Sequence, residues 1–307
     1  VGRLAADRGI DVEGRGEHAR HLVQVQQRLP QQREFARWAQ VVRDARGPVT
    51  GARVRIQATE VTTTSDRTGA FTLPWPIGAD LVTVTAWASG HYVGSAAATR
   101  DQRAVTITLK PHHTTDNPDY PWFSDAGASG SLSCSHCMPS YVEWQRDAHS
   151  RSSMNPRFLS MYAGTDLDGN QSPPTRFREG PSGERTPVPP TPGTPDLGPG
   201  FKLDHPTTAG SCGACHAPVT ASRPGHALQV DPRFLTGVDG DGVSCELCHK
   251  AGDVILDPAT GLPFPDRPGV LSMRLFRPPD GEQLFFGQFD DVARRVSYLP
   301  LIEQSAF

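Results

Sequence analysis

Two hydrophobic periods divide the first third of the chain. Between residues 17 and 45, apolar residues such as Phe35 and Trp38 recur at helical spacing with a proline break, which predicts two short amphipathic helices. From Gly47 onward, β-branched and polar residues alternate in four runs separated by turn-forming residues: VRIQATEV, AFTLPW, LVTVTAW and AVTITL. The pattern predicts an N-terminal helical segment followed by an all-β module.

The four runs and their turns follow a recurring arrangement. They read GPVTGARVRI, then TTTSDRTGAFTLPWPIG, then VTAWASGHYVG and finally VTITLKP. Through these segments, residues 47–111 resemble the carboxypeptidase regulatory-like domain. The resemblance implies a small β-sandwich that docks or spaces other parts of a protein and performs no chemistry itself.

Regular periodicity fades after Lys110. Residues 171–200 are rich in Pro and Gly and are expected to be extended, either as a free linker or as a strap over a cofactor. We therefore expect a mixed fold. It consists of short helices over residues 1–46, an all-β sandwich over 47–111, and a loop-rich, mostly helical or irregular domain over 112–307.

Composition indicates a bulky cofactor and limits the partners. Of 307 residues, 36% are hydrophobic and 7% aromatic, which is low for two apolar cores, while 30 Gly and 29 Pro require much turn and loop. The net charge of -3 comes without a basic stripe, so no nucleic-acid partner is expected. No apolar run is long enough for a transmembrane segment. The start lacks an initiator Met and a signal-peptide core, so we expect a chain whose leader has been removed.

All six cysteines fall into pairs with the same spacing, and none is left over. The pairs are Cys134 with Cys137, Cys212 with Cys215, and Cys245 with Cys248. Such pairing indicates metal, redox or haem chemistry.

Two of the pairs are followed directly by histidine, in CGACH at 212–216 and CELCH at 245–249. This is the attachment signature of c-type haem. Two thiols one helical turn apart reach the two vinyl groups, and the next residue brings its imidazole to the iron. The motifs predict His216 and His249 as proximal ligands. A zinc ribbon or disulfides would explain the cysteines but not both histidines.

The first pair differs, because CSHCM at 134–138 places Met138 where histidine is expected. Covalent haem with Met138 as a thioether ligand is one alternative, since Met/His ligation occurs in cytochromes. A second is covalent haem whose axial ligand is a remote histidine, His112 or His113. The third is a disulfide without haem. We expect a third haem here, and the sequence does not decide which residue is its axial ligand. His136 is not expected to be a ligand, because a residue between the two cysteines points in an unsuitable direction.

The surroundings of the pairs resemble a known family. The segment SCSHCMPSYVEWQRDAHSRSSMNPRF, residues 133–158, resembles an element of multihaem c-type cytochromes in which Cys-x-x-Cys is followed by Trp and then His. Trp144 and His149 occupy those places. Two further segments are similar to members of the same family: KLDHPTTAGSCGACHAPVTA at 202–221 and GDGVSCELCHKAGDVILDP at 240–258.

This resemblance covers roughly residues 115–307 and implies that His149 is a distal ligand to one of the haems. The chain departs from the family pattern at Met138. It also ends on SYLPLIEQSAF, which looks like the approach to a further Cys-x-x-Cys-His motif. We therefore expect the native chain to continue past Phe307.

Other histidines complete the set of candidate ligands. His205 and His226 flank the CGACH motif in loops with Pro neighbours and are further candidates for distal ligands. His18 and His21 lie on an Arg-rich predicted helix, where surface histidines are commoner than ligands, and His91 is expected in a loop. No motif of a catalytic nucleophile, phosphate-binding loop or metalloprotease occurs, so no catalytic residue is assigned.

These features together predict electron transfer by an exported multihaem cytochrome with haem c at two or three sites. Its partners would be other redox proteins, within an oligomer or a larger respiratory, photosynthetic or filamentous assembly. Thioether haem is made outside the cytoplasmic membrane, which predicts a periplasmic or extracellular location. The alternatives are a haem enzyme that acts on a small nitrogen or sulfur compound at the unusual first site, and a structural zinc protein.

Overall fold

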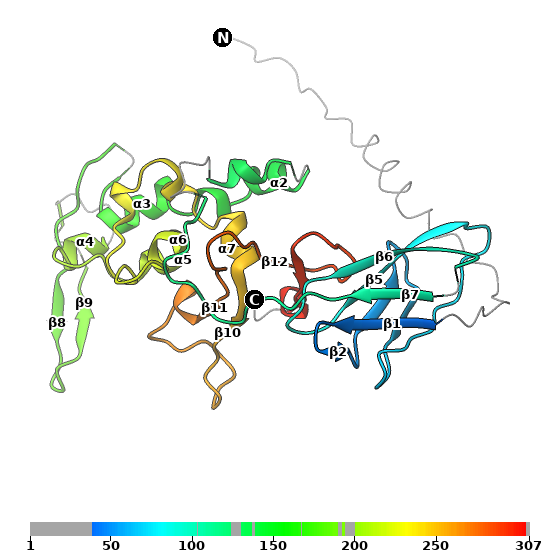
Figure 1. Ribbon diagram of the computed structural model, residues 1–307. Coiled ribbons are helices and arrows are strands. Elements are labelled where there is room, and N and C mark those ends of the chain that lie inside the picture. Colours follow the sequence, from blue (N-terminus) through cyan, green and yellow to red (C-terminus); the bar gives the residue numbers. More distant parts are fainter. Residues whose placement is uncertain are drawn as a thin grey trace, which may run out of the picture.

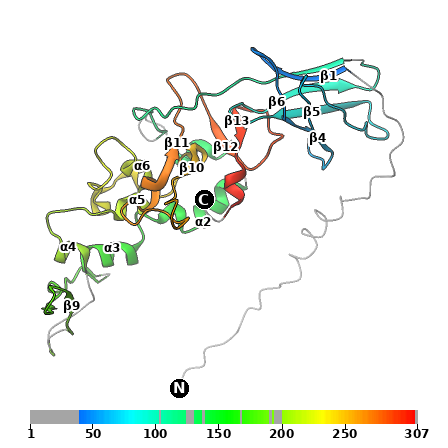
Figure 2. The same ribbon diagram turned by 90° about the horizontal axis from the view of Figure 1, so that it is seen from below.

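The computed structural model describes residues 39–304 except 103, 124–129, 137–138, 167, 190–191 and 194–199. A β module and a C-terminal part of short helices and strand pairs lie side by side (Figures 1 and 2). The predicted N-terminal helices up to residue 38, with His18 and His21, lie outside the described residues.

The β module consists of two small sheets with strand orders β2-β1-β7 and β4-β3-β5-β6. Its strands are β1 (Ala39–Asp44), β2 (Gly47–Pro48), β3 (Arg53–Ile56), β4 (Thr62–Thr64), β5 (Leu81–Trp87), β6 (Gly94–Thr99) and β7 (Ala104–Thr108). Buried and exposed side chains alternate most regularly in β7. In β7, Val105 and Ile107 are buried and their neighbours are exposed. Both sheets contribute to one apolar core that includes Val54, Phe71 and Val84. Of the four predicted runs, VRIQATEV, LVTVTAW and AVTITL contribute strands β3, β5 and β7, whereas AFTLPW forms only an isolated bridge at Ala70.

The helix predicted up to residue 45 is wrong for its last residues, which form strand β1. This strand pairs in parallel with β7, and Val42 lies opposite Ile107. Val42 is fully buried in the core of the module. A run with adjacent β-branched residues, Val41 and Val42, fits the sheet well, and a few apolar residues do not distinguish the two periods. The β module therefore includes residues 39–44.

The C-terminal part is not mostly helical, and this prediction is wrong. The described residues contain 13 strands in small sheets and six α-helices, and 23% of them are helical. The helices here are α2 (Ser140–Arg146), α3 (Pro156–Ala163), α4 (Phe201–Asp204), α5 (Cys212–His216), α6 (Pro218–Ala221) and α7 (Cys245–Lys250). The strands are β8 (Phe177–Glu179), β9 (Arg185–Pro187), β10 (Ala251–Val254), β11 (Met273–Leu275), β12 (Phe285–Gly287) and β13 (Val296–Tyr298). Short 3-10 helices connect them: η1 (Gly130–Cys134), η2 (His149–Arg151), η3 (Pro232–Phe234), η4 (Gly237–Gly240), η5 (Gly269–Ser272) and η6 (Pro300–Glu303).

Helix-ending residues explain why these helices are short. The eight-residue α3 is the longest; it begins after Asn155, whose side chain accepts hydrogen bonds from Arg157 N and Phe158 N. It ends at Gly164, which has a left-handed φ of 73°. Within the Pro/Gly-rich stretch 171–200, the described residues form the β8–β9 hairpin, which extends away from the other elements (Figure 1).

A second apolar core holds the C-terminal part together and lies among α5, α6 and α7. Trp122 and Leu247 are almost completely buried in it. Arg277, itself buried, donates to Asp116 at 2.8 Å through Nε and at 2.6 Å through Nη2. This ion pair fixes the chain that enters the C-terminal part from the β module. No helix of the described residues is both long enough and apolar enough to cross a membrane.

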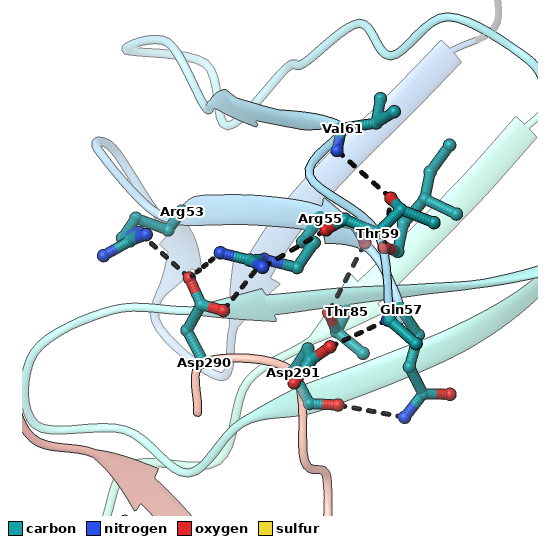
Figure 3. Close-up of polar contacts among 10 residues, drawn as sticks. Arg53, Arg55, Gln57, Thr59, Val61, Thr85, Asp290 and Asp291 are labelled. Atoms are coloured by element: carbon teal, nitrogen blue, oxygen red, sulfur yellow. Dashed lines mark hydrogen bonds and ion pairs between the residues drawn. The ribbon is translucent and has the colours of Figure 1, made fainter. Parts of the chain in front are cut away.

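Residues 282–298, which we call the return segment, bring the chain back to the β module. They contain β12 and β13, which pair in parallel. Asp290 in this segment forms ion pairs of 3.0 Å with both Arg53 and Arg55 of β3, and Ala58 N donates to Asp291 at 2.8 Å (Figure 3). The module and the C-terminal part therefore share a polar interface.

The carboxylate of Asp44 gives the β module a specific acid sensitivity. Asp44 is 5% exposed and accepts hydrogen bonds from Arg46 N at 2.8 Å, Gly47 N at 3.0 Å and the His91 ring at 3.3 Å. These bonds, the one from Arg46 N first, lower the pKa of Asp44 from 3.8 to about 2. A carboxyl group with a lowered pKa stabilises the fold above its unfolded pKa and loses this contribution as the pH falls through its folded pKa.

We expect Asp44→Asn to remove this contribution. The stability of the wild type should fall between about pH 4 and pH 2, whereas the variant, already destabilised at neutral pH, should show a smaller fall in that range. Urea unfolding at a series of pH values measures the difference. Parallel curves for the two proteins would contradict the assignment.

Candidate functional site

The CGACH motif forms α5, in which the two cysteines are more exposed than the two residues between them. Gly213 and Ala214 are buried, whereas Cys212 is half-buried and Cys215 is exposed. A Cβ atom at position 213 would lie 2.6 Å from the Cβ of Val230. Glycine at this position therefore allows α5 to pack closely while both cysteines stay accessible.

The imidazole of His216 is held by a segment far away in the sequence. Its Nδ1 lies 2.7 Å from the carbonyl oxygen of Ser152, and Ser152 Oγ donates to the carbonyl of His216 at 2.9 Å. The Phe158 ring stacks on the imidazole with 3.5 Å between centroids and an interplanar angle of 1°. With Nδ1 as donor, Nε2 is the unprotonated nitrogen that can bind a metal.

The CELCH motif forms α7, whose first turn is fixed by polar contacts. Ser244 caps the helix by accepting from Leu247 N at 3.2 Å. Glu246 is buried and accepts from Tyr120 OH at 2.7 Å and from Phe123 N at 2.8 Å. A buried carboxylate is costly unless it is hydrogen-bonded, and these two donors satisfy it.

His249 repeats the arrangement of His216. Its Nδ1 lies 2.5 Å from the carbonyl oxygen of Phe286 in β12, so Nε2 is again the free nitrogen. The residue as a whole is exposed, but the surrounding protein desolvates the ring and so lowers the pKa of His249. A lowered pKa favours the neutral imidazole, which is the form that binds a metal.

Lys250 follows His249 and is fully buried. Its Nζ donates to the carbonyl of Leu284 at 2.6 Å and lies 3.8 Å from the centroid of the Phe285 ring. Burial lowers the pKa of Lys250 to about 8. Both side chains at the end of α7, His249 and Lys250, thus bond to backbone carbonyls in and next to β12.

A cysteine of the first pair, Cys134, contacts a cysteine of the third pair, Cys245. Cys134 ends η1, and its thiol hydrogen-bonds to Cys245 at the start of α7, which lowers the pKa of Cys245. Cys137 and Met138 lie outside the described residues, so the prediction of Met138 as a ligand stays a prediction. His136 is exposed, and its Nδ1 lies 3.3 Å from the carbonyl of Ser133.

Of the predicted distal ligands, His149 lies beside both haem motifs. It begins η2, and its carbonyl accepts from Val243 N at 3.0 Å, just before α7. The same short turn supplies Ser152, the partner of His216. The ring of His149 is exposed, with Nδ1 on the carboxylate of Asp147, which leaves Nε2 free.

His205 and His226 have only local contacts among the described residues. His205 directly follows α4, is exposed, and has its ring centroid 5.0 Å from that of Phe201. His226 is exposed in a turn in which its N donates to the carbonyl of Arg223 at 3.1 Å. These contacts do not join either residue to a cysteine motif, and their role as ligands stays a prediction.

His112 and His113 lie where the chain leaves the β module. The side chain of His113 is 12% exposed, and its two ring nitrogens are buried without a hydrogen-bond partner in the described part of the chain. The Glu282 carboxylate lies 3.6 Å from Nδ1 of His113. His112 contacts the rings of Tyr92 and Phe286. An unsatisfied buried imidazole is suited to bind a metal through its free nitrogen.

The residues of the two complete motifs fit a covalently bound haem. Each short helix carries two thiols and one imidazole with a free Nε2, and exposed apolar side chains lie near α5. Met161 on α3 is 68% exposed and Phe234 on η3 is 75% exposed, and both α3 and α5 contact η3. Among the described residues, no group of three or more His, Cys, Asp or Glu side chains is arranged to hold a metal ion by itself.

Sequence reasoning missed the groups that orient the two imidazoles. These acceptors are the carbonyl oxygens of Ser152 and Phe286, and a backbone carbonyl has no residue-specific signature. The Tyr120–Glu246 hydrogen bond was missed as well, because its partners lie 126 positions apart. His91, expected in a loop, is buried in the β module and bonds to Asp44.

Comparisons with protein-family models and with curated proteins identify no relative of this chain. No protein-family model matches the sequence, and no curated protein matches it either. The resemblances to the carboxypeptidase regulatory-like domain and to multihaem cytochromes thus rest on the motifs quoted above.

The close packing of α5 makes Gly213→Ala a sensitive substitution. The added methyl group would overlap Val230, and overpacking of this kind costs about 1–3 kcal/mol. We expect a lower midpoint of urea unfolding, and Ser211→Ala, at an exposed position of the same turn, serves as the control. Equal midpoints for the two variants would show that α5 moves freely.

The cysteines of α7 should differ in reactivity in a chain purified without haem. The hydrogen bond from Cys134 lowers the pKa of Cys245, whereas burial raises the pKa of Cys248 to about 11. Since the thiolate is the nucleophile, iodoacetamide should alkylate Cys245 roughly tenfold faster than Cys248 at pH 8.

Peptide mass spectrometry measures both rates of alkylation. Cys134→Ala should slow the alkylation of Cys245, because it removes the hydrogen bond that stabilises the thiolate. An unchanged rate for Cys245 in this variant would contradict the contact between the two thiols.

Proposed function

We propose that the chain transfers electrons as part of a multihaem c-type cytochrome. One haem is held on α5 and one on α7, and a third is held by Cys134 and Cys137. The observation that carries the proposal is the hydrogen bond from Nδ1 of His216 to Ser152 and its counterpart from His249 to Phe286. In both motif histidines the hydrogen bond on Nδ1 leaves Nε2 free, which supports a role as iron ligands.

The cysteines would fix each cofactor, and the histidines would bind its iron. In each of the two complete motifs both thiols would hold haem as thioethers, and the imidazole of the following residue would bind the iron through Nε2. When bound, haem iron supplies a one-electron couple whose potential depends on its axial ligands and their hydrogen bonds. The backbone carbonyls of Ser152 and Phe286 strengthen the two imidazoles as donors.

Second axial ligands would come from histidines outside the motifs. His149 is the first choice, because Asp147 binds its Nδ1 and its turn touches the segments of both motifs. His113 has a buried free Nε2, and His205 and His226 are accessible. Met138 is the candidate at the first pair. Two strong ligands on each iron would leave no position for a substrate, which favours an electron carrier over an enzyme.

The positions of the motifs suit electron transfer between neighbouring cofactors. The thiol of Cys134 contacts that of Cys245, which would bring the first and third cofactors close together. The turn η2 contacts both His216 and Val243, which links α5 to α7. We propose that the chain works outside the cytoplasmic membrane, with other redox proteins as partners and within a larger assembly.

Optical and EPR spectra of the haem-loaded chain test this function. We expect low-spin signals throughout, and no change on addition of cyanide or nitrite. His216→Ala and His249→Ala should each convert one haem to a form that binds cyanide while the thioethers stay in place. His136→Ala, at the exposed position between two cysteines, is the matched control and should leave the spectra unchanged. A wild-type haem that binds cyanide or nitrite readily would favour an enzyme instead.

A further inference from the structure

The return segment contacts the β module along one side and α7 along the other. Its residues 282–298 include the strand pair β12–β13. Figure 1 shows β12 between α7 and the strands of the module. Two parts of the molecule that are separate in sequence therefore meet on one short piece of chain.

On the side of the module, the contact is centred on Asp290. This residue is 6% exposed, forms ion pairs of 3.0 Å with Arg53 and Arg55, and accepts a hydrogen bond from Arg55 Nη2 at 3.4 Å (Figure 3). Gln57 Nε2 adds a hydrogen bond of 2.9 Å to the carbonyl of Asp291. A buried carboxylate with two cationic partners has a defined position, because moving it would leave charges unpaired.

Strand β13 adds further bonds to the module. Val93 N donates to the carbonyl of Val296 at 2.8 Å, and Trp87 Nε1 donates to Ser297 Oγ at 3.0 Å. The Trp87 ring also meets that of Tyr298 edge-on, with 5.0 Å between centroids. These contacts fix β13, which pairs residue by residue with β12: Phe286 lies opposite Ser297.

On the other side, β12 and the residue before it supply acceptors for the end of α7. The carbonyl of Phe286 accepts from His249, and that of Leu284 accepts from Lys250. The side chains of Leu284 and Phe286 form an apolar cluster with Tyr92 of the module, and Tyr92 OH donates to the carbonyl of Gln283 at 2.8 Å. The orientation of the His249 ring therefore depends on a strand that the module holds.

We propose that Asp290 is a positioning residue for the haem held on α7. By anchoring the return segment to the β module, it keeps the Phe286 carbonyl on Nδ1 of His249 and so sets the potential of that haem. This inference rests on the proposed function. It assigns the module a role in tuning one cofactor, beyond docking or spacing.

His216 provides a control within the same molecule. Its carbonyl partner belongs to Ser152, and its stacking partner is Phe158; neither residue lies in the module or in the return segment. A change in the module should therefore leave the haem on α5 unaffected. A general loss of stability would instead affect the haems on both α5 and α7.

The test compares midpoint potentials in the full haem-loaded chain. Asp290→Ala should loosen the hydrogen bond from His249, weaken the imidazole as a donor and shift the haem on α7 to a more positive potential. Trp87→Phe removes the N–H on Ser297 and part of the ring that meets Tyr298, and it should give a smaller shift in the same direction. Asp290→Glu keeps the carboxylate and should return the potential toward that of the wild type.

Two controls show which signal belongs to the haem on α7 and whether the loss of any ion pair in the module shifts its potential. Cys245→Ser with Cys248→Ser removes the haem on α7, so the signal that disappears belongs to it. Arg46→Ala breaks an ion pair of the module in which the Arg46 side chain is 79% exposed, and it should leave both potentials unchanged. Spectroelectrochemistry with EPR reports each haem separately.

An unchanged potential for the haem on α7 in Asp290→Ala, or an equal shift of the haem on α5, would overturn the proposal. If Asp290→Ala does not fold, Trp87→Phe replaces it in the test: an unchanged potential for the haem on α7, or an equal shift of the haem on α5, would again overturn the proposal. A wild-type chain that carries no covalent haem would overturn the proposed function itself. That result differs visibly from a loaded chain with unshifted potentials.

Discussion

Each Cys-x-x-Cys-His motif depends on a hydrogen bond that its own short helix does not supply. His216 needs the carbonyl of Ser152, 64 positions earlier, and His249 needs that of Phe286, 37 positions later. A neutral imidazole has one donor and one acceptor nitrogen, so a carbonyl on Nδ1 leaves Nε2 for a metal. The fold of the C-terminal part is arranged to bring these carbonyls to the motifs.

The need to bring a backbone carbonyl to each motif histidine can be met with little regular secondary structure. The helices that carry the motifs have five and six residues, and the α5–α7 core packs them together with connecting turns. Turns and paired short strands can present a carbonyl at any angle, whereas a long helix uses its carbonyls internally. The β module also helps to position one of these carbonyls. Its contacts with Asp290 and Ser297 hold the segment whose strand β12 supplies the Phe286 carbonyl to His249.

Local patterns predicted much of the candidate site and part of the fold. Three of the four alternating runs contribute strands, and each complete cysteine motif lies on one short helix. The helical character expected of the C-terminal part was wrong, because the described helices are short; the longest of them, α3, ends at Gly164 after eight residues. Residues 39–44 form a strand because β7, about 60 residues later, pairs with them. Partners distant in sequence, such as the acceptors of His216 and His249, leave no local signal.

Counting the covalent haems tests the central claim most directly. The chain is expressed in cells that attach haem to exported proteins, and the intact mass of the denatured chain is measured together with its reduced pyridine haem spectrum. The account predicts haem that stays bound on denaturation, at least one on each complete motif, with the spectrum of thioether linkage. A denatured chain with the mass of the bare polypeptide and no haem spectrum would contradict it.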